Sequence, residues 1–261
     1  MEPVYRCVIG AFVGLFRVMG WKIDVRGSQH IPRTGGAVLA TNHIGYLDFT
    51  FVGYAARERK RLVRFMAKKE VFDHPVAGRL MRRMKHIPVD RFGSAVDALR
   101  AGVAALERGQ VVGMFPEGTV SRSFVPARAK TGAARMAMLA GVPLVPGAVW
   151  GSQRLLTKGQ PRQLQRGVAI SVAFGPPIAY GPDDDAGAVT KRLMASVAEL
   201  VDDLARTYPQ RPASDADRWW QPAHLGGTAP SAEESAARAA QESADRRARR
   251  RAERARQREG G

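Results

Sequence analysis

Short apolar runs alternate with segments of helical periodicity from Ala37 to about residue 205. This alternation is typical of an α/β domain, in which helices cover a sheet, and it excludes an all-helical or an all-β fold. Strands are expected at residues 37–40, 63–66, 87–89, 111–115, 144–149 and 168–174. We therefore predict an α/β domain for the central part of the chain.

Two segments between these runs have the pattern of amphipathic helices. Apolar residues recur at intervals of three and four from Val96 to Leu106, just before Gly109. A second series runs from Val189 to Leu204, after three acidic residues at 183–185 that suit a helix start. Each series places its apolar residues on one face, so both segments are expected to pack on the sheet.

The N-terminal segment, residues 1–24, is expected to be an amphipathic helix at a membrane interface. Its apolar run from Cys7 to Phe16 is interrupted by Arg17 and is shorter than the roughly 18 residues that a membrane span needs. Trp21 would then lie near the lipid headgroups. An ordinary helix packed in the core is the alternative.

The composition changes after Gln210, so the folded domain is expected at residues 25–210 and a polar tail at 211–261. The tail is rich in Arg, Ala and Glu and lacks an apolar face, which predicts disorder or a solvated helix. Its arginine cluster at 246–251 is suited to anionic lipid or RNA, and a purely solubilising role is the alternative. The pair Trp219 and Trp220 is expected to clamp the tail onto the domain, and a position at the membrane interface is the alternative.

The chain is strongly basic, with 41 Lys and Arg against 24 Asp and Glu and a formal net charge of +17. Such a charge favours phosphate-bearing partners, which include nucleic acid, anionic lipid and anionic substrates. Residues 57–91 carry twelve basic and four acidic side chains. This segment is either a surface attracted to anionic lipid or a solvated face. The single cysteine, Cys7, excludes an intramolecular disulfide.

His43 and Asp48 follow directly on the predicted strand at residues 37–40. On one ideal helix, a separation of five residues turns two side chains about 140° apart, so His43 must lie in the turn before the helix. Asp48 could then accept a hydrogen bond from one imidazole nitrogen and leave the other to remove a proton from an alcohol. The alternative is a capping Asn42 beside a buried polar histidine.

A second polar turn follows the predicted strand at residues 111–115. Pro116 and Gly118 shape this turn, and Glu117 supplies an acceptor. The donors suited to a phosphate group are Thr119, Ser121 and Arg122. A purely structural turn is the alternative.

Together these motifs resemble the glycerolipid acyltransferase family, whose best-known members are the 1-acylglycerol-3-phosphate acyltransferases. The family signature is a His and an Asp separated by four residues, here His43 and Asp48, followed by Phe-Pro-Glu-Gly-Thr, here residues 115–119. Residues 65–72 with 87–91 resemble the middle block of the family, and residues 142–147 resemble its last block. The resemblance covers roughly residues 20–180 and leaves the tail outside.

The resemblance implies the α/β fold of that family for the central domain. The N-terminal helical membrane anchor and the disordered or helical C-terminal tail are expected from the residues outside it. It implies that His43 is the general base on the acceptor hydroxyl and that Asp48 orients the imidazole. The residues that it implies for substrate binding are Asn42, Lys68, Arg91, Glu117, Gly118, Thr119 and Arg122. Lys68 and its neighbour Lys69 remain alternatives for the phosphate contact.

The chain departs from the family pattern after Gly118-Thr119, where many members have an arginine and this sequence has Val120. An arginine moved two positions along an extended segment stays on the same face, so Arg122 is expected to replace it. If the segment is helical instead, phosphate recognition falls to Lys68 and Arg91.

The expected reaction moves a fatty acyl group from acyl-CoA or an acylated carrier protein to 1-acylglycerol-3-phosphate, giving phosphatidic acid, at the cytosolic face of the cell membrane. No metal or bound cofactor is expected, because a thioester is already activated. One alternative is another lysolipid or a glycolipid as acceptor. The other is a non-catalytic basic protein that binds membranes or nucleic acid. The presence of His43, Asp48 and Glu117 argues against a non-catalytic membrane protein. The sequence shows no basic platform with interleaved aromatic residues, which argues against nucleic acid.

Overall fold

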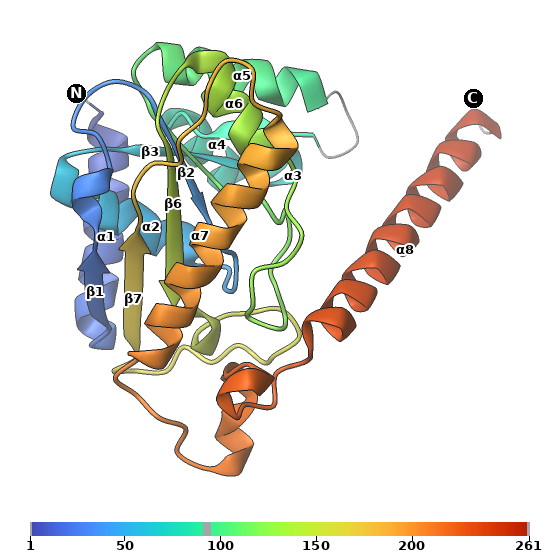
Figure 1. Ribbon diagram of the computed structural model, residues 1–261. Coiled ribbons are helices and arrows are strands. Elements are labelled where there is room, and N and C mark those ends of the chain that lie inside the picture. The colour runs from blue at the N-terminus through green and yellow to red at the C-terminus, as the bar shows by residue number, and fades with distance from the viewer. Residues whose placement is uncertain (1, 91–94, 260–261) are drawn as a thin grey trace.

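The strands form one mixed sheet in the computed structural model, which describes residues 2–90 and 95–259. In these residues the sheet has seven strands in the order β1-β7-β6-β2-β5-β3-β4 (Figure 1). Their bounds are β1 Lys22–Arg26, β2 Ala37–Thr41, β3 Val63–Lys68, β4 Ile87–Val89, β5 Val111–Met114, β6 Leu144–Trp150 and β7 Ala169–Phe174.

Five neighbouring strands, β6, β2, β5, β3 and β4, run parallel to one another. Strand β7 pairs antiparallel with β6, and β1 is parallel to β7 at the edge of the sheet. The carboxyl ends of the parallel strands therefore lie together at one end of the sheet, which is where binding and active sites form in sheets of this kind.

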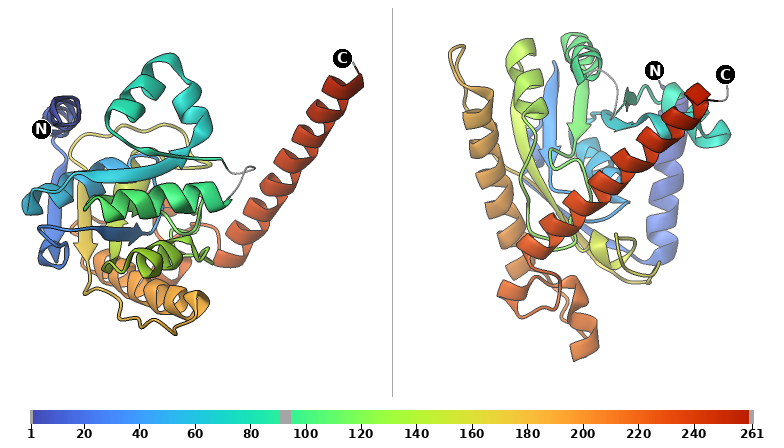
Figure 2. Two further views of the ribbon diagram at one scale, coloured as in Figure 1. Left: turned by 90° about the horizontal axis from the view of Figure 1, so that it is seen from above. Right: turned by 90° about the vertical axis from the view of Figure 1, so that its right-hand side faces the viewer.

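Helices cover both faces of the sheet. The helices are α1 Pro3–Met19, α2 Asp48–Ala56, α3 Lys69–Asp73, α4 Pro75–Arg83, α5 Ala95–Glu107, α6 Gly132–Ala140, α7 Ala186–Arg206 and α8 Ala232–Glu259. Short 3-10 helices span residues 28–30, 57–59, 152–154, 215–220 and 223–225. Figure 2 shows α6 and α7 on one side of the strands and α1 on the other, while α8 extends away from the body.

The sheet is the centre of two apolar cores. In β2 every residue is buried, and its side chains alternate between the two faces. Val38 and Ala40 join the core under α5, α6 and α7, whereas Ala37 and Leu39 join the core under α1 and α2. A strand buried on both faces reads as a continuous apolar run, which is why the sequence predicts it.

The predicted α/β fold and the six predicted strands are confirmed, but β1 was missed. This strand lies at the sheet edge, and its exposed Lys22, Asp24 and Arg26 alternate with half-buried Ile23 and Val25. The sheet therefore begins at Lys22, before the boundary expected at residue 25.

Helix α1 packs against the domain along one face. The Tyr5 hydroxyl donates to the carbonyl of Val63 at 2.6 Å, and Phe16 is buried against Phe51. The expectation that Trp21 lies near headgroups is wrong, because Trp21 is buried and its Nε1 donates to the carbonyl of Gln165. Within residues 2–90 and 95–259, no helix has both the length and the apolar character needed to cross a membrane.

The segment after Gln210 packs on the domain, so the folded body extends beyond the expected boundary. Trp220 is 1% exposed, its ring lies 4.7 Å from the Arg154 guanidinium, and its carbonyl accepts from Gln153. Ala229 is buried as well. The predicted tryptophan clamp is confirmed for Trp220. Helix α8 follows, and the side chains at 246 and 249–251 in the arginine cluster lie outside what the structure describes.

Candidate active site

The turn after β2 is fixed to the neighbouring strand by Asn42. Its side-chain amide donates to the carbonyl of Val149 at 3.0 Å and accepts from the Val149 N–H at 2.8 Å. Asn42 is fully buried. Its amide is thus occupied by the backbone of β6. The resemblance implied that Asn42 binds the substrate, but in the structure it holds the turn in place.

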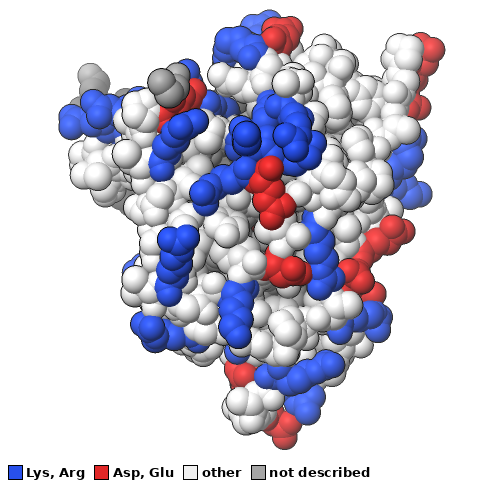
Figure 3. Space-filling view, turned by 90° about the vertical axis from the view of Figure 1, so that its left-hand side faces the viewer, with Lys and Arg blue, Asp and Glu red and all other residues white. Residues whose placement is uncertain are grey.

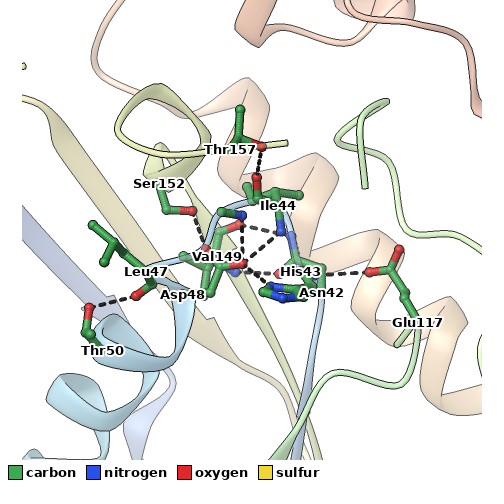
Figure 4. A network of polar contacts seen from close by, with 11 residues as sticks. Asn42, His43, Ile44, Leu47, Asp48, Thr50, Glu117, Val149, Ser152 and Thr157 are labelled. Carbon is green, nitrogen blue, oxygen red and sulfur yellow. Dashed lines mark hydrogen bonds and ion pairs between the residues drawn. The ribbon is translucent and has the colours of Figure 1, made fainter. Parts of the chain in front are cut away.

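His43 and Asp48 lie where the spacing predicted, with His43 in the turn and Asp48 as the first residue of α2. The Nδ1 of His43 is 2.9 Å from Oδ2 of Asp48 (Figure 4). The same oxygen accepts from the backbone N–H groups of Ile44 and Gly45. The hydroxyl of Ser152 donates to the other oxygen at 2.5 Å.

This geometry determines which imidazole nitrogen is available. Four donors converge on the fully buried carboxylate of Asp48 and stabilise its negative charge. When Nδ1 is the donor, Nε2 carries the lone pair. The His43 side chain is 18% exposed. The arrangement can therefore present a basic nitrogen to a molecule outside the turn.

Gly45 allows the close packing around this carboxylate. A Cβ at position 45 would lie 3.0 Å from the carbonyl and hydroxyl oxygens of Ser152 and 3.1 Å from Oδ1 of Asp48. A side chain here would push the loop that carries Ser152 away from Asp48. The glycine in the turn is thus explained by the approach of that loop.

Glu117 joins the second polar turn to the first. One carboxylate oxygen accepts from the backbone N–H of His43 at 3.1 Å (Figure 4). The other accepts from the N–H of Ala127 at 3.0 Å. The carbonyl of His43 in turn accepts from the N–H of Ser121 at 2.7 Å. Burial raises the pKa of Glu117 to about 7, although the two backbone donors and the nearby His43 act to lower it.

The segment that follows Glu117 carries Gly118, Thr119 and Arg122. Gly118 has a φ of +69°, a left-handed conformation that glycine adopts without strain. Residues 115–130 form neither helix nor strand, so the helical alternative for Arg122 is not observed. The Arg122 side chain is 16% exposed and its guanidinium is 2.6 Å from a carboxylate oxygen of Glu242.

Lys68 ends β3 at the same sheet edge as the two polar turns. Phe65 is in register with Gly113 of β5. Lys68, three residues after Phe65, therefore lies at the carboxyl ends of the strands, where the turn with Glu117 begins. Its side chain is exposed. Arg91, the other cation expected at the phosphate, lies outside the described residues.

Part of the basic segment at 57–91 is structural. Arg61 is buried and donates to the carbonyls of Pro32, Gly35 and Gly109. Arg64 is 4% exposed and donates to the carbonyl of Met84. These two guanidiniums tie loops together and are not available to a phosphate.

An apolar cavity lies between α1, α2 and β3. Its lining includes Phe12, Phe49 and Phe65. The rings of Phe65 and Phe115 are 6.2 Å apart, and the Phe115 ring stacks on the imidazole of His43 at 4.0 Å. An aromatic path thus connects the cavity with His43.

Three residues of the site were missed by the sequence analysis: Ser152, Lys158 and Glu242. Lys158 forms an ion pair with Glu242, and its ammonium is 3.5 Å from the hydroxyl of Thr119. Ser152 and Lys158 follow β6 in a loop without a motif, and Glu242 belongs to the tail. No local pattern in the sequence could have assigned them to the site.

Comparison with known proteins identifies the family of the chain. The family model described as Acyltransferase matches residues 22–150. A 1-acyl-sn-glycerol-3-phosphate acyltransferase of Bacillus subtilis is 30% identical over 141 residues, which are 53% of this chain and 69% of that protein. The chloroplastic enzyme LPAT1 of Arabidopsis thaliana, named for the same activity, is 30% identical over 70% of this chain and 50% of its own length.

A solved structure has the same fold. The crystal structure of the 1-acyl-sn-glycerophosphate (LPA) acyltransferase PlsC from Thermotoga maritima matches with a TM-score of 0.64. The match covers 79% of this chain and 81% of the other, at 22% sequence identity.

Proposed function

This chain belongs to the acyltransferase family and is an acyltransferase, and on this premise we propose that it acylates the free hydroxyl of 1-acylglycerol-3-phosphate to give phosphatidic acid. The observation that carries the proposal is the 2.9 Å contact of His43 Nδ1 with the buried carboxylate of Asp48. The names of the relatives describe this reaction for those proteins. The acyl donor is an acyl thioester, either acyl-CoA or an acylated carrier protein.

In the proposed step, Nε2 of His43 removes the proton of the acceptor hydroxyl while the hydroxyl oxygen attacks the thioester carbonyl carbon. The new C–O bond forms a tetrahedral intermediate, and the C–S bond then breaks. The thiolate leaves and takes the proton from the imidazolium, so His43 returns to its starting state. Asp48 stabilises the imidazolium between the two steps. The thioester is already activated, so the step needs no bound cofactor.

Arg122 is the proposed contact for the phosphate of the acceptor, supported by Lys68 and Arg91 from other parts of the chain. Arg122 follows Ser121, whose N–H is bonded to the carbonyl of His43. Its guanidinium already binds a carboxylate, which supports an affinity for anionic oxygens. A phosphate held there would lie beside the turn that carries the base.

We propose that an acyl chain enters at the apolar cavity, whose enclosed space of about 30 Å³ would have to widen as the chain binds. It is lined by aromatic and aliphatic side chains of α1 and α2. The Phe65 and Phe115 rings connect it with His43, so a chain lying there would end near the base. The reacting carbonyl and the hydroxyl could then meet at Nε2.

We propose that the enzyme is a peripheral protein on the cytosolic face of the cell membrane. Helix α1 exposes Leu15 (43%) and Val18 (64%) on the face away from the domain. Figure 3, which shows the side of the molecule with α1, has many more Lys and Arg than acidic side chains. Apolar side chains next to cations suit a surface of anionic lipid.

The test is acyl transfer from labelled acyl-CoA and acyl-carrier protein to a panel of lysolipids in vesicles. His43→Ala is expected to lower turnover by about 10²-fold or more. His224→Ala is the matched control, because His224 is an exposed histidine that pairs with Asp202 outside the site. Phosphatidic acid made by the wild type and the control but not by His43→Ala would support the reaction and the base.

Three other results would contradict part or all of this proposal. Product on a different lysolipid would keep the base and replace the acceptor. Normal turnover in His43→Ala would remove His43 as the base. Absence of product with every donor and acceptor would overturn the proposed reaction.

A further inference from the structure

The C-terminal helix places an acidic side chain on cations beside the candidate active site. The two carboxylate oxygens of Glu242 in α8 are taken by different partners, one by Arg122 at 2.6 Å and the other by the ammonium of Lys158. The side chains of Arg122 and Lys158 are 16% and 17% exposed. Seven residues earlier on α8, the hydroxyl of Ser235 accepts from the N–H of Arg122.

Both cations are attached to the turn that carries His43. Ser121, next to Arg122, donates its N–H to the carbonyl of His43 at 2.7 Å. Thr157, next to Lys158, donates its hydroxyl to the carbonyl of Ile44 at 2.5 Å (Figure 4). The loop after β5 and the loop after β6 therefore bring one cation each to the edge of the same turn.

The pair has the properties of a site for a doubly charged anion. Each cation binds a different oxygen of the Glu242 carboxylate. Together they lower the pKa of Glu242 to about 2, and the hydrogen bond from Arg122 has the largest effect. A phosphate monoester carries a charge of about −1.5 to −2 and three terminal oxygens, so it satisfies both cations better than a carboxylate does.

We propose that Arg122 and Lys158 together bind the phosphate of the acceptor and that Glu242 occupies this site in the resting chain as a built-in competitor. The inference rests on the proposed function and adds two elements to it. Lys158 is a second phosphate-binding residue, and α8 must move off the two cations before the acceptor binds.

The amino-acid composition of α8 suits a helix that is bound to the domain by polar and ionic contacts alone. Its sequence lacks large apolar residues, so it has no apolar face to bury. In the described part of the chain it contacts the loop after β5 through Ser235 and Glu242. Polar contacts of this kind are weakened by competing anions and by salt.

The first test compares the intact chain with Glu242→Gln in steady-state acyl transfer. The variant keeps the shape of the side chain and removes its charge, so the KM for 1-acylglycerol-3-phosphate is expected to fall roughly three- to tenfold with little change in kcat. The KM for a neutral lysolipid should not change. Glu233→Gln is the matched control, because Glu233 is exposed on the same helix and its substitution makes the same charge change.

Lys158→Ala tests the second cation. It is expected to raise the KM for the phosphorylated acceptor roughly tenfold or more, and Lys158→Arg should restore most of the loss. An equal loss on the phosphorylated and the neutral acceptor would contradict a role in phosphate binding.

A binding measurement tests the site without turnover. Inorganic phosphate is titrated into the intact chain and followed by 31P NMR. Glu242→Gln should bind phosphate three- to tenfold more tightly than the wild type, roughly the effect of two partly exposed ion pairs. Arg122→Ala should bind it weakly.

The outcomes separate this inference from the proposed function. Suppose that Glu242→Gln changes neither KM nor phosphate binding, while Arg122→Ala raises KM and weakens phosphate binding. The role of Glu242 as a competitor is then disproved, and the phosphate site stands. If none of the variants changes either quantity, both are disproved. Tighter phosphate binding by Glu242→Gln in a chain that acylates no lysolipid would support the anion site and overturn the proposed reaction.

Discussion

A side-chain oxygen of Glu117 lies 3.1 Å from the backbone nitrogen of His43 and accepts its hydrogen. This bond connects two motifs that are 74 residues apart in the chain. Because the other oxygen accepts from Ala127, Glu117 braces the turn of the base against the loop that carries Arg122. The glutamate of the second motif thus works through position, by setting where the backbone of His43 lies.

Glu117 should make the stability of the protein depend on pH. Burial raises its pKa from 4.5 to about 7, so the folded protein keeps a proton that the unfolded chain has lost. This contribution to the free energy of unfolding is fully present below pH 4.5 and is lost as the pH rises through 7. We expect the difference in unfolding free energy, wild type minus Glu117→Gln, to fall by about 3 kcal/mol over this range.

Chemical denaturation of both proteins at a series of pH values measures this difference. His86 changes stability in the opposite direction, because burial lowers its pKa to about 4 and its contribution is lost as the pH falls below 6.5. It is present in both proteins and cancels in the difference. A difference that stays constant from pH 4.5 to 7 would contradict the buried proton on Glu117.

Ser152 should contribute to turnover without touching the substrate. Its hydroxyl is one of the four donors to the carboxylate of Asp48, and it is fully buried. Ser152→Ala removes a hydrogen bond to a charged group, which is worth about 1.5–3 kcal/mol. We expect kcat to fall by roughly tenfold or more, with KM nearly unchanged. Steady-state kinetics test this, with the thermal unfolding midpoint as the check on folding, and an unchanged kcat would rule out the role.

Asp48→Asn should have a larger effect than Ser152→Ala. The amide that replaces the carboxylate carries no charge to stabilise an imidazolium, and an NH2 group facing Nδ1 favours the wrong tautomer. We expect kcat to fall by about 10³-fold or more. Single-turnover acyl transfer measures the chemical step. A loss no greater than that of Ser152→Ala would indicate that Asp48 only shapes the turn.

Arg122→Ala should discriminate between acceptors. The loss of a charged donor is expected to lower kcat/KM for 1-acylglycerol-3-phosphate by roughly 10- to 100-fold. A neutral lysolipid should lose little, since it has no phosphate for Arg122 to bind. Parallel assays on both acceptors make the comparison, and Arg122→Lys is expected to retain part of the activity. Equal losses on both acceptors would mean damage to the fold.

The exposed apolar face of α1 should be needed for membrane binding. Leu15→Glu with Val18→Glu places two negative charges on the proposed contact surface, so cosedimentation with anionic vesicles is expected to drop severalfold. Leu139→Glu is the control, because Leu139 is 65% exposed on α6, across the sheet from α1. Undiminished sedimentation of the double variant would move the membrane contact to another surface.

The central strands and the His43–Asp48 pair could be predicted because their signals are local. Strands buried on both faces give uninterrupted apolar runs. The four residues between His43 and Asp48 leave few arrangements at the start of a helix. Strand β1 could not be predicted because it lies at the sheet edge, where charged residues alternate with half-buried ones and no apolar run marks the strand. Its pairing with β7 depends on residues far away in the chain.

The roles of Asn42, Trp21 and Glu242 could not be predicted for the same reason. In the sequence, an asparagine beside a candidate catalytic histidine could as well bind a substrate. Only the structure shows that the backbone of Val149 already bonds its amide. Trp21 follows a short apolar helix, yet the carbonyl of Gln165 provides its partner inside the protein. Glu242 is one acid among many in a segment without periodicity.

The buried ring of Trp220 determines what happens to α8 after it leaves the two cations. Because the chain is anchored at Trp220, the freed helix stays tethered close to the site instead of diffusing away. A short tether of this kind keeps Glu242 at an effective concentration on the order of millimolar. An acceptor concentrated in a membrane therefore displaces the tethered carboxylate more completely than the same acceptor dispersed in water at a lower local concentration.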